Sequence, residues 1–300
     1  NNLNTIEDRF TQRIIWCNLW QMVRDNALSP IWFLKLVDKY SSIENDPNVL
    51  QGQMLQKVIG IKNIYLTEKN RIFWSDHLSN LAIENLKKGK NNQFQIAWFD
   101  LLYEAAESSQ HISELKNILD GKVKYDNLIV DQGKRWQIVS KLCAYNYVDS
   151  SKIINTEIKN DPGDLGKKRA FTAKVSVPDL DQKSKWWDTF VSEKQSESSA
   201  YLRYGMEGFF WYSQKNILEP YVDKFFNNLK NIYETKDMHY SSYYTNFLFP
   251  MSMDVEKTLK QTEYFISENN DLPKLCQKSL KEMCDHLRRR QPILKEQKNN

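Results

Sequence analysis

Apolar residues recur along almost the whole chain at helical spacings, and this period most constrains the fold. Spacings of three, four, seven and eight residues place side chains on one face of an α-helix. Four stripes show the pattern most clearly: Ile15, Leu19, Met22 and Val23; Leu50, Met54, Val58, Ile61 and Tyr65; Leu218, Tyr221, Val222, Phe225, Leu229 and Ile232; Cys276, Leu280, Met283 and Leu287. Only 9 Gly and 8 Pro occur in 300 residues, which is few for an all-β protein. We therefore predict an all-α fold.

Helix starts and breaks are also marked in the sequence. Ser29-Pro30 and Asp46-Pro47 each place a capping side chain before a proline at the first helical position. Short breaks are predicted at 91–92, Gly121, Gly133, 161–163 and 178–179. The apolar run 128–130 is too short to predict a strand.

Tryptophans mark the apolar faces of several predicted helices, namely Trp74, Trp98, Trp136 and Trp186. Helix pairs recur at uneven intervals of several tens of residues, which resembles a HEAT-like or armadillo-like array. We predict a curved array of antiparallel helix pairs that forms a superhelical bowl. We expect a single domain over residues 1–300, with a possible seam in the polar segment 192–199.

The charge and cysteine patterns limit the partners and the compartment. The net charge of +4 is dispersed, and the only dense basic cluster, Arg288 to Arg290, is expected near a helix end, where cations complement the helix dipole. We therefore predict no nucleic-acid partner. No apolar run is long enough to span a membrane. The four cysteines form no CxxC pair, and Cys276 and Cys284 are expected to be buried free thiols, so we predict a cytoplasmic protein that binds no membrane.

The sequence contains no recognisable catalytic set. His77, His111, His239 and His286 are widely separated, whereas zinc ligands come in spaced groups. Nucleophile-elbow and phosphate-loop motifs are absent. Cys143 lies on an apolar face and is predicted to be a packed thiol. We predict no catalytic residue, metal or cofactor in these 300 residues.

Several less common strings occur in a fixed order along the chain. They are RIIWCNLWQMVRD at 13–25, DQGKRW at 131–136, DPGDLG at 161–166, KWW at 185–187, EGFFWYSQ at 207–214, ILEPY at 217–221 and FP at 249–250. This order resembles the C-terminal helical domain of the M1 zinc aminopeptidases, the aminopeptidase N type.

The resemblance implies a role within a larger enzyme. In that family the HExxH zinc helix, its distant Glu ligand and the GxMEN motif lie in upstream domains, and the helical domain closes the catalytic chamber. The resemblance thus implies that zinc belongs to the full-length enzyme and that the partners are an upstream catalytic domain of the same chain and peptide substrates. We expect these residues to be a piece of a longer chain and to be inactive alone.

Four residues are candidates for the chamber wall: Arg135, Trp136, Arg203 and Gln214. Arginine suits this role because its planar fork binds a peptide carboxylate through two hydrogen bonds. The alternatives are structural. Arg135 could pair with Asp131 and Arg203 with Glu207, both at i, i+4 spacing.

Other structural and functional alternatives stay open at this point. Gln214, with Trp211 and Tyr212, could lock the turn in which it lies. The chain could also be a free-standing α-solenoid scaffold that binds a protein along a concave face. An RNA-binding helical repeat is disfavoured by the dispersed charge.

Overall fold

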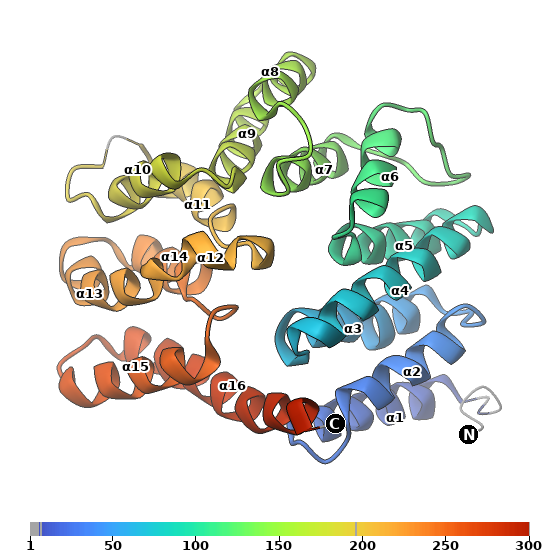
Figure 1. Cartoon of the computed structure of the whole chain (residues 1–300), viewed down its shortest axis with the longest axis horizontal. Coiled ribbons are helices and arrows are strands. Elements are labelled where there is room, and N and C mark those ends of the chain that lie inside the picture. The colour runs from blue at the N-terminus through green and yellow to red at the C-terminus, as the bar shows by residue number, and fades with distance from the viewer. Residues whose placement is uncertain (1–5, 7, 196, 300) are drawn as a thin grey trace. The chain divides into compact units, whose positions relative to one another are not determined.

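The computed structural model describes residues 6, 8–195 and 197–299, and within these residues every regular element is a helix and no strand occurs (Figure 1). The predicted all-α class is confirmed. The chain divides into two compact units. The first, called here the terminal unit, contains Asn1–Val130 and Arg289–Asn300; the second, the middle unit, is Asp131–Arg288. The predicted curvature stays a prediction.

The terminal unit is built from helices in close succession. They are α1 (Arg9–Arg24), α2 (Pro30–Ser41), the π-helix η2 (Val49–Leu55), α3 (Gln56–Gly60), the π-helix η3 (Ile61–Tyr65), α4 (Glu68–Lys87), α5 (Asn92–Ala105) and α6 (Ser109–Leu119), joined by the end of α16 (Lys274–Asn299). The predicted stripe from Leu50 to Tyr65 is confirmed, since all five side chains are buried. Asp46 caps the start of this run as expected, because its Oδ1 accepts hydrogen bonds from the amides of Asn48 and Val49. The side-chain cap predicted at Ser29 is wrong: Ser29 precedes Pro30 at the start of α2 but makes no side-chain cap hydrogen bond.

The predicted stripe of α1 is partly wrong. Met22 is exposed, whereas Trp16 is buried and Trp20 is half-buried. Both indole rings pack edge-on against Phe33 of α2, with centroids 5.6 and 6.3 Å away. The larger apolar area of the indole decides which face turns inward.

The middle unit contains the remaining helices, joined by short loops. They are α7 (Gln132–Ala144), α8 (Ser150–Asn160), α9 (Asp164–Ser176), α10 (Leu180–Val191), α11 (Ser199–Glu207), the 3₁₀-helix η4 (Tyr212–Gln214), α12 (Lys215–Leu218), α13 (Pro220–Thr235), α14 (Met238–Leu248), α15 (Val255–Glu268) and the first part of α16. The predicted breaks at 161–163 and 178–179 are confirmed. The break predicted at Gly133 begins earlier, because Asp131 caps α7 and Gly133 already lies in its first turn.

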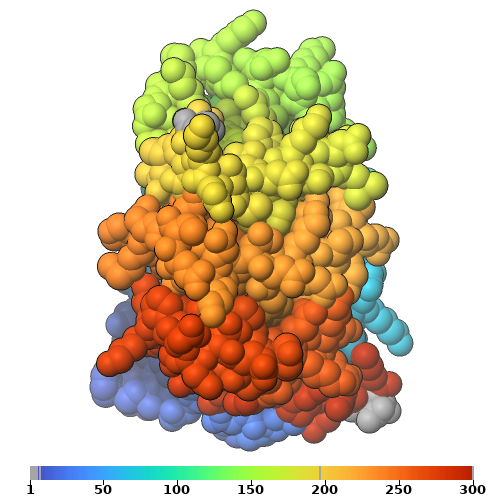
Figure 2. Space-filling view, turned by 90° about the vertical axis from the view of Figure 1, so that its left-hand side faces the viewer, coloured from blue at the N-terminus to red at the C-terminus, as the bar shows by residue number. Residues whose placement is uncertain are grey.

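Helices of the middle unit alternate between two layers. One row is formed by α7, α9, α11 and α14, each in contact with the next. On the other side α8 contacts α7 and α9, α10 contacts α9 and α11, and α13 contacts α14. Successive segments of this unit stack in chain order, from the yellow through the orange to the red layer of Figure 2. This alternation is the pairwise packing that the sequence predicts for a helical array.

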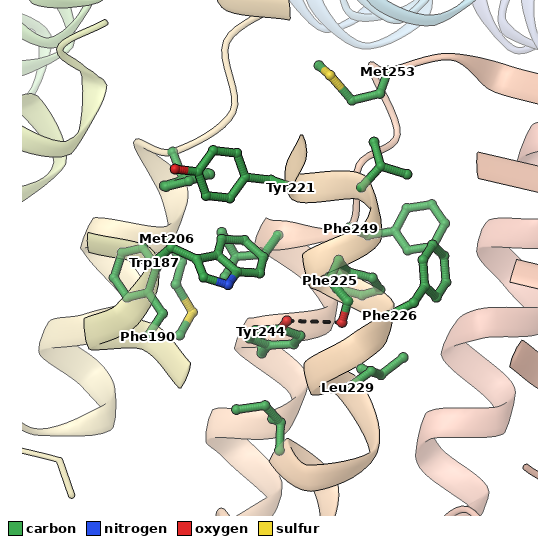
Figure 3. Packing of buried hydrophobic residues seen from close by; sticks show 14 of the residues in the cluster. Trp187, Phe190, Met206, Tyr221, Phe225, Phe226, Leu229, Tyr244, Phe249 and Met253 are labelled. Atoms are coloured by element: carbon green, nitrogen blue, oxygen red, sulfur yellow. Dashed lines mark hydrogen bonds between the residues drawn. The ribbon is translucent and has the colours of Figure 1, made fainter. Parts of the chain in front are cut away.

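The core of the middle unit is aromatic (Figure 3). The predicted stripe from Leu218 to Ile232 is confirmed, because Leu218 of α12 and the stripe's members in α13 are all buried. Phe225 stacks on Tyr244 of α14 at 5.1 Å, and the Tyr244 hydroxyl donates a hydrogen bond of 3.1 Å to the Phe225 carbonyl. The polar atom of a fully buried ring is thereby satisfied.

Trp186 lies on the apolar face of α10 as expected, since it is half-buried and its ring lies 5.1 Å from that of Phe171; the fully buried tryptophan of this helix is its neighbour Trp187. One further expectation needs correction. The arginine run does not end a helix, because α16 continues to Asn299; instead Arg288 binds Glu263 and Arg289 pairs with Asp25. The single domain over residues 1–300 and the seam in segment 192–199 stay predictions; of that segment, residues 192–195 and 197–198 lie between α10 and α11, and residue 196 lies outside the described residues.

Two glycines lie at the end of α11: Gly205 in its last turn and Gly208, its C-cap, in the EGFFWYSQ string. A methyl group at Gly205 would lie 2.4 Å from the Phe171 ring, and one at Gly208 would lie 2.3 Å from the Thr172 carbonyl oxygen. The Thr172 hydroxyl also donates to the carbonyl of Tyr204 at 2.7 Å. These glycines therefore allow the backbones of α9 and α11 to approach closely.

We predict that Gly208→Ala lowers the stability of the chain by about 1–3 kcal/mol, because the methyl group overlaps a backbone carbonyl that cannot easily move. Gly52→Ala is the matched control: no atom lies within 4 Å of its added methyl group, and the position is helical. Urea unfolding followed by tryptophan fluorescence measures both variants. Equal stabilities of the two variants would contradict a close approach of α9 to the backbone at Gly208.

Candidate functional site

Arg135 lies in the first turn of α7 and forms an ion pair with Glu157 of α8. Its Nε and Nη2 atoms donate to Oε1 and Oε2 of Glu157, both at 2.7 Å. The Glu157 side chain is buried and the Arg135 side chain is 28% exposed. Burial on its own would raise the pKa of Glu157, but hydrogen bonds from Arg135 and Gln132 outweigh it and hold this pKa below its ordinary value. Asp131, the partner expected from spacing, instead caps α7 by accepting from the Lys134 amide at 2.9 Å.

Trp136 packs in the interior beside the turn between α8 and α9. Its side chain is 2% exposed, and its Nε1 donates to Oδ2 of Asp161 at 3.0 Å. The same oxygen lies 3.8 Å from Nη1 of Arg169. A methyl group at Gly166 would lie only 1.9 Å from the Asp161 carbonyl oxygen, which accounts for the glycine in the DPGDLG string.

Arg203 lies on α11 and is 35% exposed. The expected ion pair with Glu207 is confirmed, with Nε 3.3 Å from Oε1. The guanidinium carbon also lies 4.9 Å from the Tyr204 ring centroid and 5.8 Å from that of Tyr243, a cation–π arrangement. Burial raises the pKa of Glu207, and the charge of Arg203 opposes this shift. Two rings and one carboxylate thus hold the guanidinium in place.

Gln214 is buried and joins the ends of two helices. Its Nε2 donates to the carbonyl of Ala144, the last residue of α7, at 2.9 Å and to that of Ser176, the last residue of α9, at 2.7 Å. The last carbonyls of a helix have no partner within the helix. The amide therefore satisfies two such groups at once, and the structural role foreseen for the EGFFWYSQ turn is confirmed for this residue.

Lys183 is the residue that the sequence analysis missed. It is fully buried, and its Nζ donates to the carbonyls of Val175 at 2.8 Å and Phe209 at 2.6 Å. Burial lowers the pKa of Lys183 to about 7. The signal was present, because Lys183 continues the buried stripe of Trp187 and Phe190 towards the start of α10. We call Lys183 and Gln214, with the carbonyls of Val175 and Ser176, the α9 cap.

The sequence-predicted candidates thus separate into two kinds. Trp136 and Gln214 are buried and engaged in joining helix ends and turns. Arg135 and Arg203 keep part of their side chains exposed. Within the described part of the chain, neither Nη group of Arg203 donates a hydrogen bond. Arg135, by contrast, donates from Nε and Nη2 to Glu157.

The described residues do not fit a zinc ion. Among them, no group of three or more His, Cys, Asp or Glu side chains is arranged to hold a metal. His111, the buried histidine, bonds to Ser108 and Asn80 instead. Burial raises the pKa of the Cys143 thiol to about 11, which agrees with the expected packed thiol. No helix in the part of the chain described is both long and apolar enough to cross a membrane.

Comparison with known proteins identifies the family of this chain. Residues 2–289 match the ERAP1-like C-terminal domain family. The chain belongs to this family. It is also similar to aminopeptidase N of Streptomyces lividans, with 23% identity over 267 residues. The match covers 89% of this chain and 31% of that relative, so the chain spans about a third of the relative's length.

We predict that Gln214→Ala lowers the stability of the chain by about 1–3 kcal/mol, because two buried carbonyls lose their donor. Ser213→Ala, at the exposed neighbouring position, is the matched control and should change stability by less than about 0.5 kcal/mol. Urea midpoints of both variants measure the difference. A Gln214→Ala midpoint equal to that of the control would show that the α9 cap contributes little.

Lys183 predicts a pH dependence of stability. Its pKa falls from 10.5 in the unfolded chain to about 7 in the fold, so between these values the unfolded state binds a proton that the native state lacks. Stability due to this group therefore rises with pH across this window, by about 1.4 kcal/mol per pH unit. Lys183→Met should remove this slope. Urea unfolding of both proteins between pH 7.5 and 9.5 tests it, and parallel curves would contradict the depressed pKa.

Proposed function

We propose that this chain is the C-terminal helical domain of a zinc aminopeptidase that removes N-terminal amino acids from peptides. The family match over residues 2–289 carries the proposal, and the similarity to an aminopeptidase N supports it. The proposed partners are an upstream catalytic domain of the same polypeptide and peptide substrates. Zinc and the catalytic residues belong to that upstream domain, and this chain alone is proposed to be inactive.

The proposed task of this domain is to close the catalytic chamber and help to hold the peptide. A closed chamber excludes bulk water, which strengthens the electrostatic interactions inside it. The domain contributes a rigid wall, because buried aromatic packing and capped helix ends fix its surface side chains. Rigid positioning matters because a substrate that is held loosely reacts more slowly.

Arg203 is the proposed contact for the peptide's C-terminal carboxylate. Its Nη groups can donate to a carboxylate while Nε remains on Glu207. Tyr204 and Tyr243 fix the guanidinium plane, so little side-chain entropy is lost when a peptide binds. Arg135 is the second candidate, but its fork already binds Glu157 through two bonds.

We place the enzyme in the cytoplasm because its cysteines are free thiols. The four cysteines are free, and Cys143, Cys276 and Cys284 are buried. Free buried thiols are typical of reducing compartments.

Sequencing the coding region upstream of residue 1 tests the proposed function. An in-frame HExxH followed by a Glu ligand supports a domain of a zinc aminopeptidase. A start codon immediately before Asn1 in a gene without a zinc motif would instead favour a free-standing α-solenoid scaffold, and the aminopeptidase proposal would be abandoned.

We predict that Arg203→Ala in the full-length enzyme raises KM about tenfold for short peptides with a free C-terminus, because a charged hydrogen bond is lost. KM for the same peptides with an amidated C-terminus, and for a small chromogenic amino-acid amide, should stay unchanged. Steady-state kinetics on the three substrates measures this.

Arg288→Ala is the matched control for the Arg203 experiment. It also removes an ion-paired arginine from the middle unit, where Arg288 binds Glu263. It should leave KM unchanged for all three substrates. An equal loss on amidated and free peptides in Arg203→Ala would exclude carboxylate binding by this residue.

A further inference from the structure

The end of α16 belongs to a different compact unit from its beginning. Residues 274–288 lie in the middle unit, whereas residues 289–299 pack with the first 130 residues. The family match ends at residue 289. The remaining turns of the helix therefore lie outside the region that the family match covers.

Gln297 bridges two successive helices of the terminal unit. Its Nε2 donates to the carbonyl of Tyr65, the last residue of η3, at 2.6 Å. Its Oε1 accepts from the amide of Thr67, the cap of α4, at 3.2 Å and from Nδ2 of Asn70 at 3.1 Å. One side chain thus satisfies backbone groups that the end of one helix and the start of the next leave unpaired.

Most other contacts of the segment 289–299 are polar and lie at the surface. Two side chains of the segment are buried, Arg290 before Pro292 and Ile293 after it, and Ile293 is the buried apolar anchor. Arg289 pairs with Asp25, and Glu296 accepts a hydrogen bond of 3.1 Å from Asn26. The side chains of Arg289 and Asp25 are 33% and 58% exposed. Segments held by few buried apolar contacts open more readily than the core.

Pro292 lies inside α16, within four residues of the boundary between the units. Proline has no amide hydrogen, so the helix lacks the bond from residue 292 to the carbonyl of Arg288. The proline ring also crowds that carbonyl. This turn is therefore the weakest point of α16, and it separates the end of the helix from the part in the middle unit.

We propose that residues 293–299 form a releasable clasp on the terminal unit, which opens as one body about Pro292 and uncovers the junction of η3 and α4. The middle unit stays folded when the clasp opens. The clasp is a conformational device that goes beyond the proposed function and does not depend on it.

Hydrogen–deuterium exchange on the full chain tests the clasp. Amides of residues 293–299 and 67–70, the start of α4 where the Thr67 amide donates to Gln297, should exchange through one shared opening, faster than those of the α13 core. Gln297→Ala should speed exchange in both segments by about tenfold, since at least one net hydrogen bond is lost. Exchange in α13 should stay unchanged.

Two variants on the same segment make the test specific. Gln291→Ala is the matched control, because Gln291 makes no side-chain hydrogen bond within the described residues, and it should change neither segment. Pro292→Ala restores the missing helical bond and should slow exchange in both segments. Unequal opening of the two segments in the native chain, or Gln297→Ala that speeds only residues 293–299, would overturn the clasp.

Discussion

The backbone carbonyls at the end of α9 set the constraint on which the middle unit depends. Helix ends leave such groups without partners, and α9 ends inside the protein, where water cannot replace them. Lys183 of α10 binds the Val175 carbonyl and Gln214 of η4 binds that of Ser176. Because Gln214 also binds the end of α7, and Lys183 the Phe209 carbonyl after α11, the five elements α7, α9, α10, α11 and η4 are joined at this cap.

In the terminal unit, too, a glutamine side chain bonds to backbone groups at the ends of two helices. Gln297 joins the end of η3 to the start of α4, as Gln214 joins the ends of α7 and α9. An amide suits this task because it carries both donors and an acceptor on one neutral group. The difference lies in burial: Gln214 is enclosed by the core, whereas Gln297 lies on a segment with exposed polar neighbours. The junction at Gln214 is fixed, whereas the junction at Gln297 can open.

Some contacts of the candidate site could be predicted from the sequence, and others could not. The pair of Arg203 and Glu207 was predictable, since both residues lie on one helix at a spacing that brings them together. The partner of Arg135 was not, because Glu157 comes from another helix 22 residues away, while Asp131 is used as a cap. Lys183 was missed because a lysine is rarely buried without a carboxylate. Its burial depends on two carbonyls that only the fold brings together.

The sequence by itself determined the all-α class, most buried stripes, the cap at Asp46 and the order of motifs that places the chain in its family, because these depend on local spacing and local chemistry. The tertiary structure alone decided which ring of Trp186 and Trp187 is buried, why Gly208 must be small, and where α16 passes from one compact unit to the other. Those outcomes depend on contacts between residues far apart in the chain. Periodicity identifies the face that turns inward, but packing against a neighbouring helix selects the side chain that fills it.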